Sequence, residues 1–490
     1  MTLKSMRLVP VWVALIVFIT LAMYALQNTD QHQIRLGGYR QKAQQSQQPQ
    51  SELPTKPQAP QPSRETQVAH RVDPECADFP DTSNVLILLK TGASEIYRRI
   101  PMHYMSMLKC MPDNVLLFSD LAQTVGGHVV YDSLDNVLPA VKQHNNDFLL
   151  YHRQQQCHIS REECNKNYDT GSEGWNLDKY KNSHIAEKAW KMHPNYDWYF
   201  YIDADTYVSW RNLMSWLKNV DPTKPHYIGG IQRSGYFPFA HGGTGYLLSQ
   251  ATMRDLFTKE PKLGNKWDER VSHHCCGDIM WAEIMVNETG LEPEEMFPAL
   301  NPKKANTVKY SDKQWCQPII TLHKLLTEDV DLMYTFENDV VKSGNALKFR
   351  DLYNHFVKDN LREVLADWDN ASDDEFYIDP KINPDDRNQD EWRELPNRVK
   401  KDNLSPVEKE AWKSHTNCKK ACESHDDCLQ WRYLNGVCGI GREILYGVSA
   451  KKEDDNAKRT YSGWRLETIK KFVDKQASCD KPWDWPVKDL

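Results

Sequence analysis

The chain has 490 residues, which is more than one ordinary domain holds. Lys and Arg number 61 against 68 Asp and Glu, so the formal net charge of -7 gives no basic surface to argue for a nucleic-acid partner. Hydrophobic residues make up 40% of the chain, which is enough for a sizeable packed core.

An uncharged apolar stretch, residues 8–26, lies near the N-terminus. Its length is about what a helix needs to cross a membrane. Lys4 and Arg7 precede it, so the positive-inside rule places the tail, residues 1–7, in the cytosol and the rest of the chain in the lumen. A cleaved signal peptide is the alternative. The residues after position 26 make a poor cleavage site, which favours an uncleaved signal anchor.

Residues 27–75 form a polar segment that cannot bury a core. Gln fills six of the ten positions from 41 to 50, and four prolines follow before residue 63. This composition predicts an extended, solvated stem. All twelve cysteines lie beyond residue 75, and in a luminal protein many of them should form disulfides.

The order of tail, anchor, stem and cysteine-bearing domain is typical of a Golgi-resident single-pass type II membrane enzyme with a luminal catalytic domain. A cell-surface receptor shares this order. Asn-x-Ser/Thr sequons at Asn287, Asn370 and Asn403 offer glycan acceptors, and Pro406 weakens the third.

From residue 84 to about 375, apolar runs alternate with helix-like segments. The runs predicted as strands are residues 84–92, 114–120, 147–152 (the weakest), 197–203, 226–231 and 318–324. The segments predicted as helices are residues 95–110 and 179–193. This alternation indicates an α/β domain, residues 76–375, with parallel pairing and ligands bound at the carboxyl ends of the strands.

The alternation ends near residue 375. Residues 376–404 are charged and interrupted by proline, which predicts a linker. Residues 405–480 contain four closely spaced cysteines: Cys418, Cys422, Cys428 and Cys438. The first two are four residues apart and share one helix face, so this segment is predicted to be a small disulfide-stapled module.

Two carboxylates, Asp203 and Asp205, end the buried-looking run "WYFYI". Carboxylates at the end of a buried strand need a positive partner, or they cost stability. Hard oxygen ligands suit Mg²⁺ or Mn²⁺, and diphosphate oxygens can complete the coordination shell. The alternative is a strand-end turn in which Asp205 or Thr206 caps the next element.

Three further motifs carry candidate chemistry. In "HGGTGYLLS" the glycines let the backbone approach a ligand, or they make a tight turn into a strand. In "HHCCGD" adjacent His and Cys invite a zinc interpretation, which the oxidation of luminal thiols disfavours. Asp278 of this motif either caps a helix or faces a sugar. His323, at another strand end, is structural or completes an oxygen-plus-imidazole site that favours Mn²⁺.

Together, "DWYFYIDADTYVSWRNLMSWL", "GGTGYLLS", "CCGD" and "TLHK" resemble glycosyltransferase family 31, the family of the core 1 β1,3-galactosyltransferases and Fringe. The resemblance is strongest to fungal members, through "KTGASE", "LKCMPDNVLLFSD" and "GWNLDKYK", and covers roughly residues 84–372. The segment "CKKACESHDDCLQWRYLNGVCGIG" resembles a PAN/apple-like module. That likeness implies the pairs Cys418–Cys438 and Cys422–Cys428.

The resemblance implies a GT-A (Rossmann-like) fold, a UDP-sugar donor, Mn²⁺ or Mg²⁺, and inversion at the anomeric carbon. Asp278 matches the general base of the family. The residues that match its metal ligands are Asp203, Asp205 and His323. The residues that match donor-proximal positions are Asp203, Trp175, Asp178, Lys179, Gly242 and Gly243, and Gly242, Gly243 and Gly245 match the segment that lines the acceptor side.

The expected activity is metal-dependent transfer of a hexose, galactose in β1,3 linkage, to a glycan or glycoprotein acceptor. Two departures leave the acceptor open: Asp-Ala-Asp replaces the three consecutive aspartates of animal core 1 enzymes, and Cys-Cys-Gly precedes Asp278. The alternative is a non-catalytic, membrane-anchored glycan- or protein-binding protein on a transferase fold.

Overall fold

The structure is a computed structural model that describes residues 76–111, 114–342, 346–382, 398–456, 458–476 and 478–479. All of these residues belong to one compact unit, residues 71–490. The predicted tail, anchor and stem lie outside the described residues. None of the helices within the described ranges combines the length and apolar character needed to span a bilayer.

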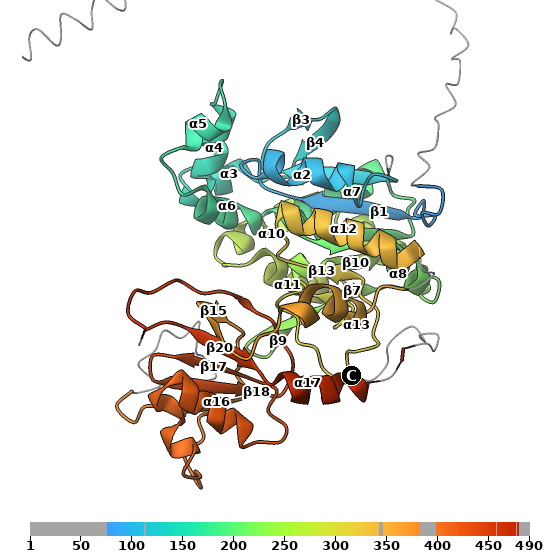
Figure 1. Ribbon diagram of the computed structural model, residues 1–490. Coiled ribbons are helices and arrows are strands. Elements are labelled where there is room, and N and C mark those ends of the chain that lie inside the picture. Colours follow the sequence, from blue (N-terminus) through green and yellow to red (C-terminus); the bar gives the residue numbers. More distant parts are fainter. Residues whose placement is uncertain are drawn as a thin grey trace, which may run out of the picture. The chain divides into compact units, whose positions relative to one another are not determined.

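An eight-stranded mixed sheet forms the centre of the α/β part (Figure 1). Its strands, from edge to edge, are β11 (Glu294–Glu295), β7 (Tyr227–Gly229), β10 (Tyr246–Ser249), β5 (Trp198–Asp203), β1 (Val85–Lys90), β2 (Val115–Ser119), β4 (His128–Asp132) and β3 (Gln123–Val125). Strands β5, β1, β2 and β4 run parallel, whereas β10 is antiparallel to both of its neighbours. The carboxyl ends of β1 and β5 therefore meet at one edge.

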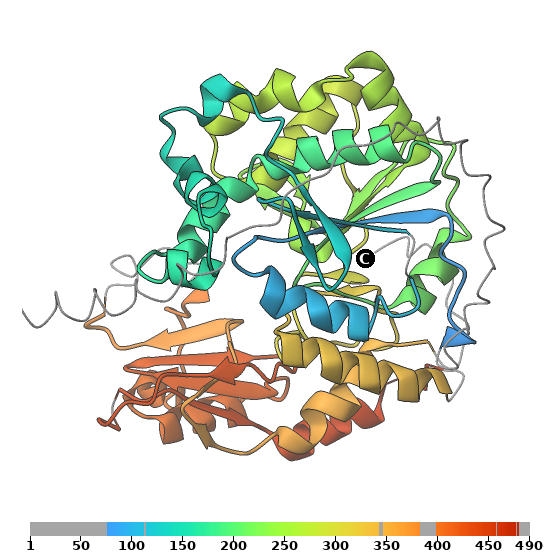
Figure 2. The same cartoon turned by 90° about the horizontal axis from the view of Figure 1, so that it is seen from above.

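Helices cover both faces of this sheet (Figure 2). They are α2 (Ile96–Met105), α3 (Pro139–Lys142), α4 (Leu149–Gln155), α5 (Arg161–Asn165), α6 (Thr170–Asp178), α7 (Lys181–Met192), α8 (Trp210–Leu217), α9 (Gln250–Lys259), α10 (Leu263–Ser272), α11 (Gly277–Thr289), α12 (Thr327–Lys342) and α13 (Phe349–Leu352). Alternate residues of β1 belong to different cores, because successive side chains of a strand point to opposite faces. Ile87 packs with α2, α8 and α12, and Leu88 packs with α7, α9 and α11.

Most predicted elements of this part are confirmed, and one is wrong. The run 147–152 is not a strand: it forms the 3₁₀ turn η2 (Asn146–Phe148) and the start of α4. Asn145 begins this helical segment by accepting a hydrogen bond from the backbone N–H of Asp147. Short apolar runs such as this one do not distinguish a strand from a helix by periodicity.

Short strands next to the main sheet shape its carboxyl edge. A three-stranded sheet consists of β12 (Leu300–Asn301), β13 (Thr321–Leu322) and β6 (Tyr207–Val208). A hairpin consists of β8 (Ile231–Ser234) and β9 (Phe237–Ala240). The run 318–324 was predicted as a strand of the α/β sheet, but only its two central residues form β13, and they belong to the small sheet.

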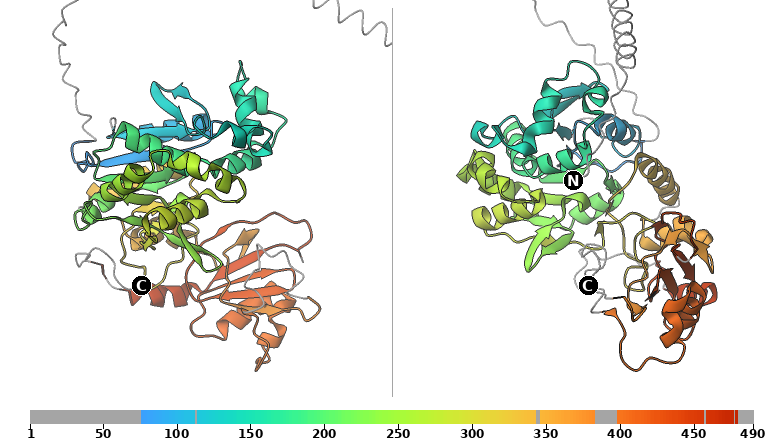
Figure 3. Two further views of the ribbon diagram at one scale, coloured as in Figure 1. Left: turned by 180° about the vertical axis from the view of Figure 1, so that it is seen from behind. Right: turned by 90° about the vertical axis from the view of Figure 1, so that its left-hand side faces the viewer.

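The C-terminal region is built on a five-stranded sheet (Figure 3). Its strands, in order, are β14 (Leu365–Ala366), β20 (Tyr461–Trp464), β17 (Gln430–Leu434), β18 (Val437–Gly441) and β16 (Glu375–Ile378). The strands β15 (Trp368–Asp369) and β19 (Val448–Ser449), the 3₁₀ turn η7 (Glu408–Lys413) and the helices α16 (His415–Glu423) and α17 (Leu466–Asp474) complete it. The disulfides Cys418–Cys438 and Cys422–Cys428 confirm the pairing that the resemblance implied.

Two expectations about this region are wrong. Residues 376–378 were predicted to start a linker, but they complete β16, which pairs with β18, and Phe376 and Tyr377 are buried in different hydrophobic clusters on its opposite faces. The sequon at Asn370 is not accessible for glycosylation in the folded protein, because this side chain is fully buried and its Nδ2 donates to the carbonyl of Trp431 at 3.2 Å. A charged composition around residue 380 concealed the strand.

The C-terminal region was also predicted to be a separate module, and the structure contradicts this. Trp464 and Ile469 belong to the same hydrophobic core as β1 and α12. The backbones of Tyr310 and Ile444 exchange hydrogen bonds of 2.8 and 3.2 Å. A disulfide, Cys316–Cys479, joins the α/β part to the end of the described chain. The two parts therefore share packing, backbone pairing and a covalent bond.

Candidate active site

The turn after β5 places both aspartates at the carboxyl edge of the sheet. Asp203 is the last residue of β5 and lies opposite Lys90 in the parallel register. The turn closes through a hydrogen bond from the N–H of Thr206 to the carbonyl of Asp203, and the Thr206 hydroxyl donates to the carbonyl of Gly243 at 2.8 Å. Thr206 thus fixes the turn against the neighbouring glycine segment and does not act as a helix cap.

His323 reaches the aspartates because of the small sheet. β6 follows the Asp-Ala-Asp turn directly, and it pairs antiparallel with β13, which ends one residue before His323. The carbonyl of Asp205 also accepts a hydrogen bond from the N–H of Leu325 at 3.0 Å. As a result, His323 Nε2 lies 3.3 Å from Asp205 Oδ1. The sequence-predicted metal residues are therefore brought together from two distant segments.

The chemistry of this trio fits a divalent cation. One ligand atom each of Asp203, Asp205 and His323 lie within 4.8 Å of one another. The buried Nδ1 of His323 has no hydrogen-bond partner among the described residues. A Cβ atom at Gly243 would lie 2.2 Å from the imidazole, so only glycine leaves room for the ring. Two carboxylates with one imidazole suit Mn²⁺ or Mg²⁺.

The two aspartates have different electrostatic environments. Partial burial raises the pKa of Asp203, and Lys90 opposes this only in part. Burial would also raise the pKa of Asp205, but the hydrogen bond and charge of His323, together with the charge of Arg99, outweigh that effect, and the pKa is lowered. Neighbouring groups therefore compensate the charge of Asp205, whereas that of Asp203 is compensated only in part.

Lys90 was not predicted as a site residue. Its Nζ lies 2.5 Å from Asp178 and 3.3 Å from Asp203, and the side chain is almost fully buried. Burial would lower the pKa of Lys90, but the charges of Asp178 and Asp203 outweigh it and raise the pKa. The only sequence signal was a lysine at the end of an apolar strand, whose partners depend on the register with β5.

His103 is a second residue that the sequence analysis missed. It lies on α2, is fully buried, and its Nε2 is 2.8 Å from the carbonyl of Ala204, between the two aspartates. Burial lowers the pKa of His103, which favours the neutral ring with the proton on Nε2. This hydrogen bond fixes the backbone of the Asp-Ala-Asp turn.

Asp278 lies beside the glycine segment. It is in the first turn of α11, whose N-cap is Cys276, so the alternative in which Asp278 caps the helix is wrong. Its Oδ2 accepts a hydrogen bond of 3.0 Å from the N–H of Gly242, which opens the 3₁₀ turn η3 (Gly242–Thr244). The sequence of this segment is compatible with a close approach to a ligand and with a turn into a strand. It turns into β10, with Gly245 ending the turn, and it also borders the site.

Lys179 and Trp175, both predicted to lie near the donor, differ in burial: Lys179 is buried and Trp175 is exposed. The Lys179 ammonium lies 2.8 Å from Asp147 and donates to the carbonyls of Ser272 and His274 at 3.3 and 3.0 Å. Its charge therefore supports the loop after α10, and its donor contact stays a prediction. Trp175, on α6, is 57% exposed.

The segment between α10 and α11 is not a zinc site. Cys275 and Cys276 form a disulfide with each other, so neither offers a thiolate. All twelve cysteines of the chain are paired in this way or with more distant partners. The disulfide lies at the N-terminus of α11, directly before Gly277 and Asp278.

One cavity of about 590 Å³ is lined by the three candidate metal ligands and by Asp278, Lys90, Lys179 and Trp175. It is bordered by the carboxyl ends of β1 and β5, the loop from β1 into α2, the C-terminal turn of α6, the glycine segment and the start of α11. His241, another residue not predicted, lines it beside His323, with ring centroids 5.3 Å apart. Burial lowers the pKa of His241 to about 4, which keeps this ring neutral near pH 7.

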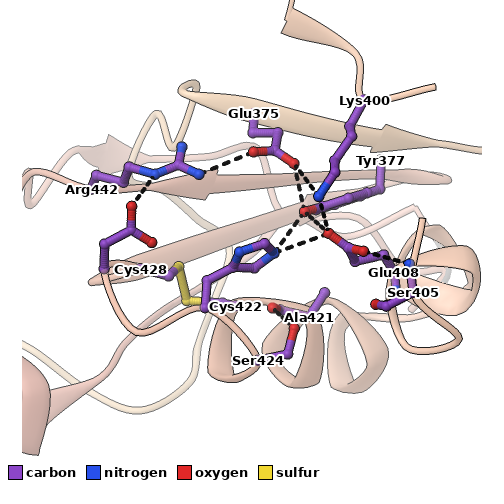
Figure 4. A network of polar contacts seen from close by, with 12 residues as sticks. Glu375, Tyr377, Lys400, Ser405, Glu408, Ala421, Cys422, Ser424, Cys428 and Arg442 are labelled. Carbon is purple, nitrogen blue, oxygen red and sulfur yellow. Dashed lines mark hydrogen bonds and ion pairs between the residues drawn. A yellow bond between two sulfur atoms is a disulfide. The ribbon is translucent and has the colours of Figure 1, made fainter. Parts of the chain in front are cut away.

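A second acid–histidine cluster lies in the C-terminal region (Figure 4). Ligand atoms of Glu375, Glu408 and His425 also lie within 4.8 Å of one another. Here Lys400 Nζ lies 2.5 Å from Glu408 and 3.6 Å from Glu375. The chain's own ammonium thus contacts both carboxylates of this cluster, so their charge is compensated without a metal ion.

A protein-family model matches the chain within the α/β part. Residues 143–275 match the family model described as Fringe-like. The matched range contains Trp175, Asp203 and Asp205, and it ends before Asp278 and His323. Among curated proteins, no match to the chain was found. The match supports a Fringe-like glycosyltransferase, with a sugar donor and a glycan acceptor.

Proposed function

We propose that the protein is an inverting, metal-dependent glycosyltransferase of the GT-A fold. It transfers a hexose, galactose in β1,3 linkage, from a UDP-sugar to a glycan or glycoprotein. The observation that carries this proposal is the convergence of Asp203, Asp205 and His323 at one sheet edge, in the cavity that also holds Asp278. Neither a binding module nor a structural domain needs this set of groups in one cavity.

The trio would hold Mn²⁺ or Mg²⁺, which supplies positive charge where the donor diphosphate leaves. The chain positions this trio with its own groups. Lys90 lies against Asp203, and His103 holds the carbonyl of Ala204. Gly243 leaves space for the His323 ring. These contacts fix the ligands before any donor binds, which is how a site limits its reorganisation.

Asp278 is the proposed general base. The Gly242 N–H occupies its Oδ2, which orients the carboxylate and leaves Oδ1 to accept the proton of the acceptor hydroxyl. The hydroxyl oxygen then attacks the anomeric carbon while the bond to the UDP oxygen breaks. A single displacement from the side opposite the leaving group inverts the configuration. The reaction needs no further reactant, because Asp278 takes the proton of the hydroxyl and the UDP oxygen takes the electron pair of the broken bond.

We further propose a Golgi location, with residues 8–26 as a type II membrane anchor and the catalytic part in the lumen. The six disulfides support an oxidising compartment, because cytosolic thiols are kept reduced. The C-terminal region is proposed to be a PAN/apple-like module. The rival function, non-catalytic glycan binding, is favoured only by that module.

A UDP-release assay on the full chain in detergent separates these functions. A panel of UDP-sugars is tested with Mn²⁺, with Mg²⁺ and with EDTA, with and without simple glycosides. We expect UDP release from at least one donor with either metal and none in EDTA. UDP release that EDTA leaves unchanged would remove the metal from the proposal. No release from any donor, with all disulfides intact, would favour the binding protein.

A further inference from the structure

Trp175 is an unusual tryptophan in this protein. The indoles of Trp198, Trp216 and Trp281 are fully buried, whereas that of Trp175 is 57% exposed. It lies on α6 three residues before Asp178, and it lines the cavity of the active site. A large exposed aromatic ring in a concave site is typical of a surface that a ligand covers.

The Cys275–Cys276 disulfide lines the same cavity. Two contacts fix it beside α6: the Lys179 ammonium donates to the carbonyl of His274, and Gly277 packs on the backbone of Lys179. A Cβ atom at Gly277 would lie only 2.8 Å from the Lys179 Cα, so this approach requires glycine. Trp175 and the disulfide thus belong to two neighbouring, mutually supported segments.

This wall lies on the side of the general base. Asp278 follows the disulfide by two residues and contacts Gly242. Other lining residues, such as Arg99, lie next to Asp205 instead, because the Arg99 guanidinium donates to the carbonyl of Leu325, whose N–H bonds Asp205. An acceptor must present its hydroxyl to the base, so the surface next to the base is where its ring lies.

We propose that Trp175 and the Cys275–Cys276 disulfide form an apolar platform for the pyranose ring of the acceptor. A pyranose has a face made only of C–H bonds, which packs on an indole or a disulfide, while its hydroxyls face polar groups such as Asp278. This proposal rests on the proposed function and deepens it. It places Trp175 at the acceptor, whereas the family resemblance suggested the donor.

The test compares glycoside and nucleotide binding by the full chain in detergent. The probes are methyl β-galactopyranoside, methyl α-mannopyranoside and methyl α-N-acetylgalactosaminide, observed by saturation-transfer NMR, and UDP with Mn²⁺, observed by calorimetry. For wild type we expect enhancements concentrated on the C–H protons of one ring face. Trp175→Ala should weaken glycoside binding about tenfold, Trp175→Phe should retain it, and both should bind UDP like wild type.

Tyr97→Ala is the matched control, because Tyr97 is 60% exposed on α2 and is not among the cavity-lining residues. It should leave both affinities unchanged. Three results would overturn the platform: no enhancement of any glycoside by wild type, unchanged glycoside binding by Trp175→Ala, or loss of UDP affinity in that variant with glycoside binding intact. Failure of the proposed function is distinguishable, because Trp175-dependent glycoside binding without turnover of any UDP-sugar contradicts transfer and supports the platform.

Discussion

The protein contains two clusters of the same composition, two carboxylates and a histidine, that differ in what neutralises them. In the C-terminal region, Lys400 lies between Glu375 and Glu408, and Arg442 and the Ser405 N–H bind the remaining oxygens. At the sheet edge, the Lys90 ammonium contacts Asp178 and, of the three candidate metal ligands, Asp203. Asp205 and His323 line a cavity, and Nδ1 of His323 has no hydrogen-bond partner in the described part of the chain.

The difference shows that residue types alone do not define a metal site. Where a lysine or arginine of the chain compensates the carboxylates, the cluster stabilises the fold. Where part of the negative charge stays uncompensated beside a cavity, the cluster can bind a metal ion. The pKa of Glu408 illustrates the first case: burial would raise it, but the hydrogen bonds from Lys400 and Ser405 lower it to about 2. Substitutions in either cluster can break or sharpen this contrast.

The largest effect is expected from Asp205→Ala. Losing this ligand should lower UDP-sugar turnover at least about 10³-fold, because the charge that faces the leaving diphosphate is lost. Mn²⁺ should raise the unfolding temperature of wild type and not that of the variant. Glu408→Gln is the matched control from the other cluster and should keep the Mn²⁺ response. If Glu408→Gln loses that response and Asp205→Ala keeps it, the two assignments are reversed.

Asp278→Asn should reduce transfer by about 10²–10⁴-fold, the usual contribution of a general base. The asparagine oxygen can still accept from the Gly242 N–H, so UDP affinity and stability should match wild type. Glu283→Gln, on the same helix and paired with Arg270, controls for loss of an acid on α11. Transfer within a few-fold of wild type would leave Asp278 as a support for the glycine turn only.

His103→Phe should weaken Mn²⁺ binding about 10- to 100-fold, the range typical for outer-shell partners. The ring would still fill the space on α2, but the carbonyl of Ala204 would lose its donor. Calorimetry with Mn²⁺ measures the affinity, and saturating Mn²⁺ should restore most of the turnover. His103→Gln, which can donate to the same carbonyl, should lie between the two. Equal Mn²⁺ affinity in all three proteins would contradict this role.

The smallest effect is expected from Glu408→Gln, on stability alone. Removing this charge leaves Lys400 with Glu375 as its remaining acidic partner and should cost about 1–3 kcal/mol at pH 7 in urea denaturation. The folded pKa of about 2 lies below the unfolded value of 4.5, so the stability from ionised Glu408 is present above pH 4.5 and disappears as the pH falls toward 2.

The difference between wild type and Glu408→Gln should therefore shrink across that acidic window. Adding Lys400→Met to Glu408→Gln should recover part of the loss, because the unpaired ammonium is removed. A constant difference from pH 7 to pH 2 would show that Glu408 acts through packing and not through its charge.

The parts that the sequence predicts are those with a strong local signal. β1 and β5 are largely apolar runs. Asp203 is the last residue of β5, and Asp205 follows shortly after the strand. His323 is a candidate from its place at a strand end, but only the family register favoured the metal role over a structural one. Lys90 and His103 could not be predicted, because their roles depend on which strand or carbonyl lies opposite them in space. For the same reason β16 was hidden: its partner strand β18 lies in a segment that had been assigned to another domain.

The bond between Cys316 and Cys479 also constrains biosynthesis. The two cysteines are separated by 163 residues, so Cys316 emerges from the ribosome long before its partner exists. At about 5–20 residues per second, this interval is roughly 10–30 s, during which the thiol needs protection from wrong partners. A transcript that stops short of residue 479 yields a chain whose α/β part keeps one reactive thiol. In the luminal compartment proposed above, retention by thiol-recognising chaperones would make completion of the C-terminus a condition for export.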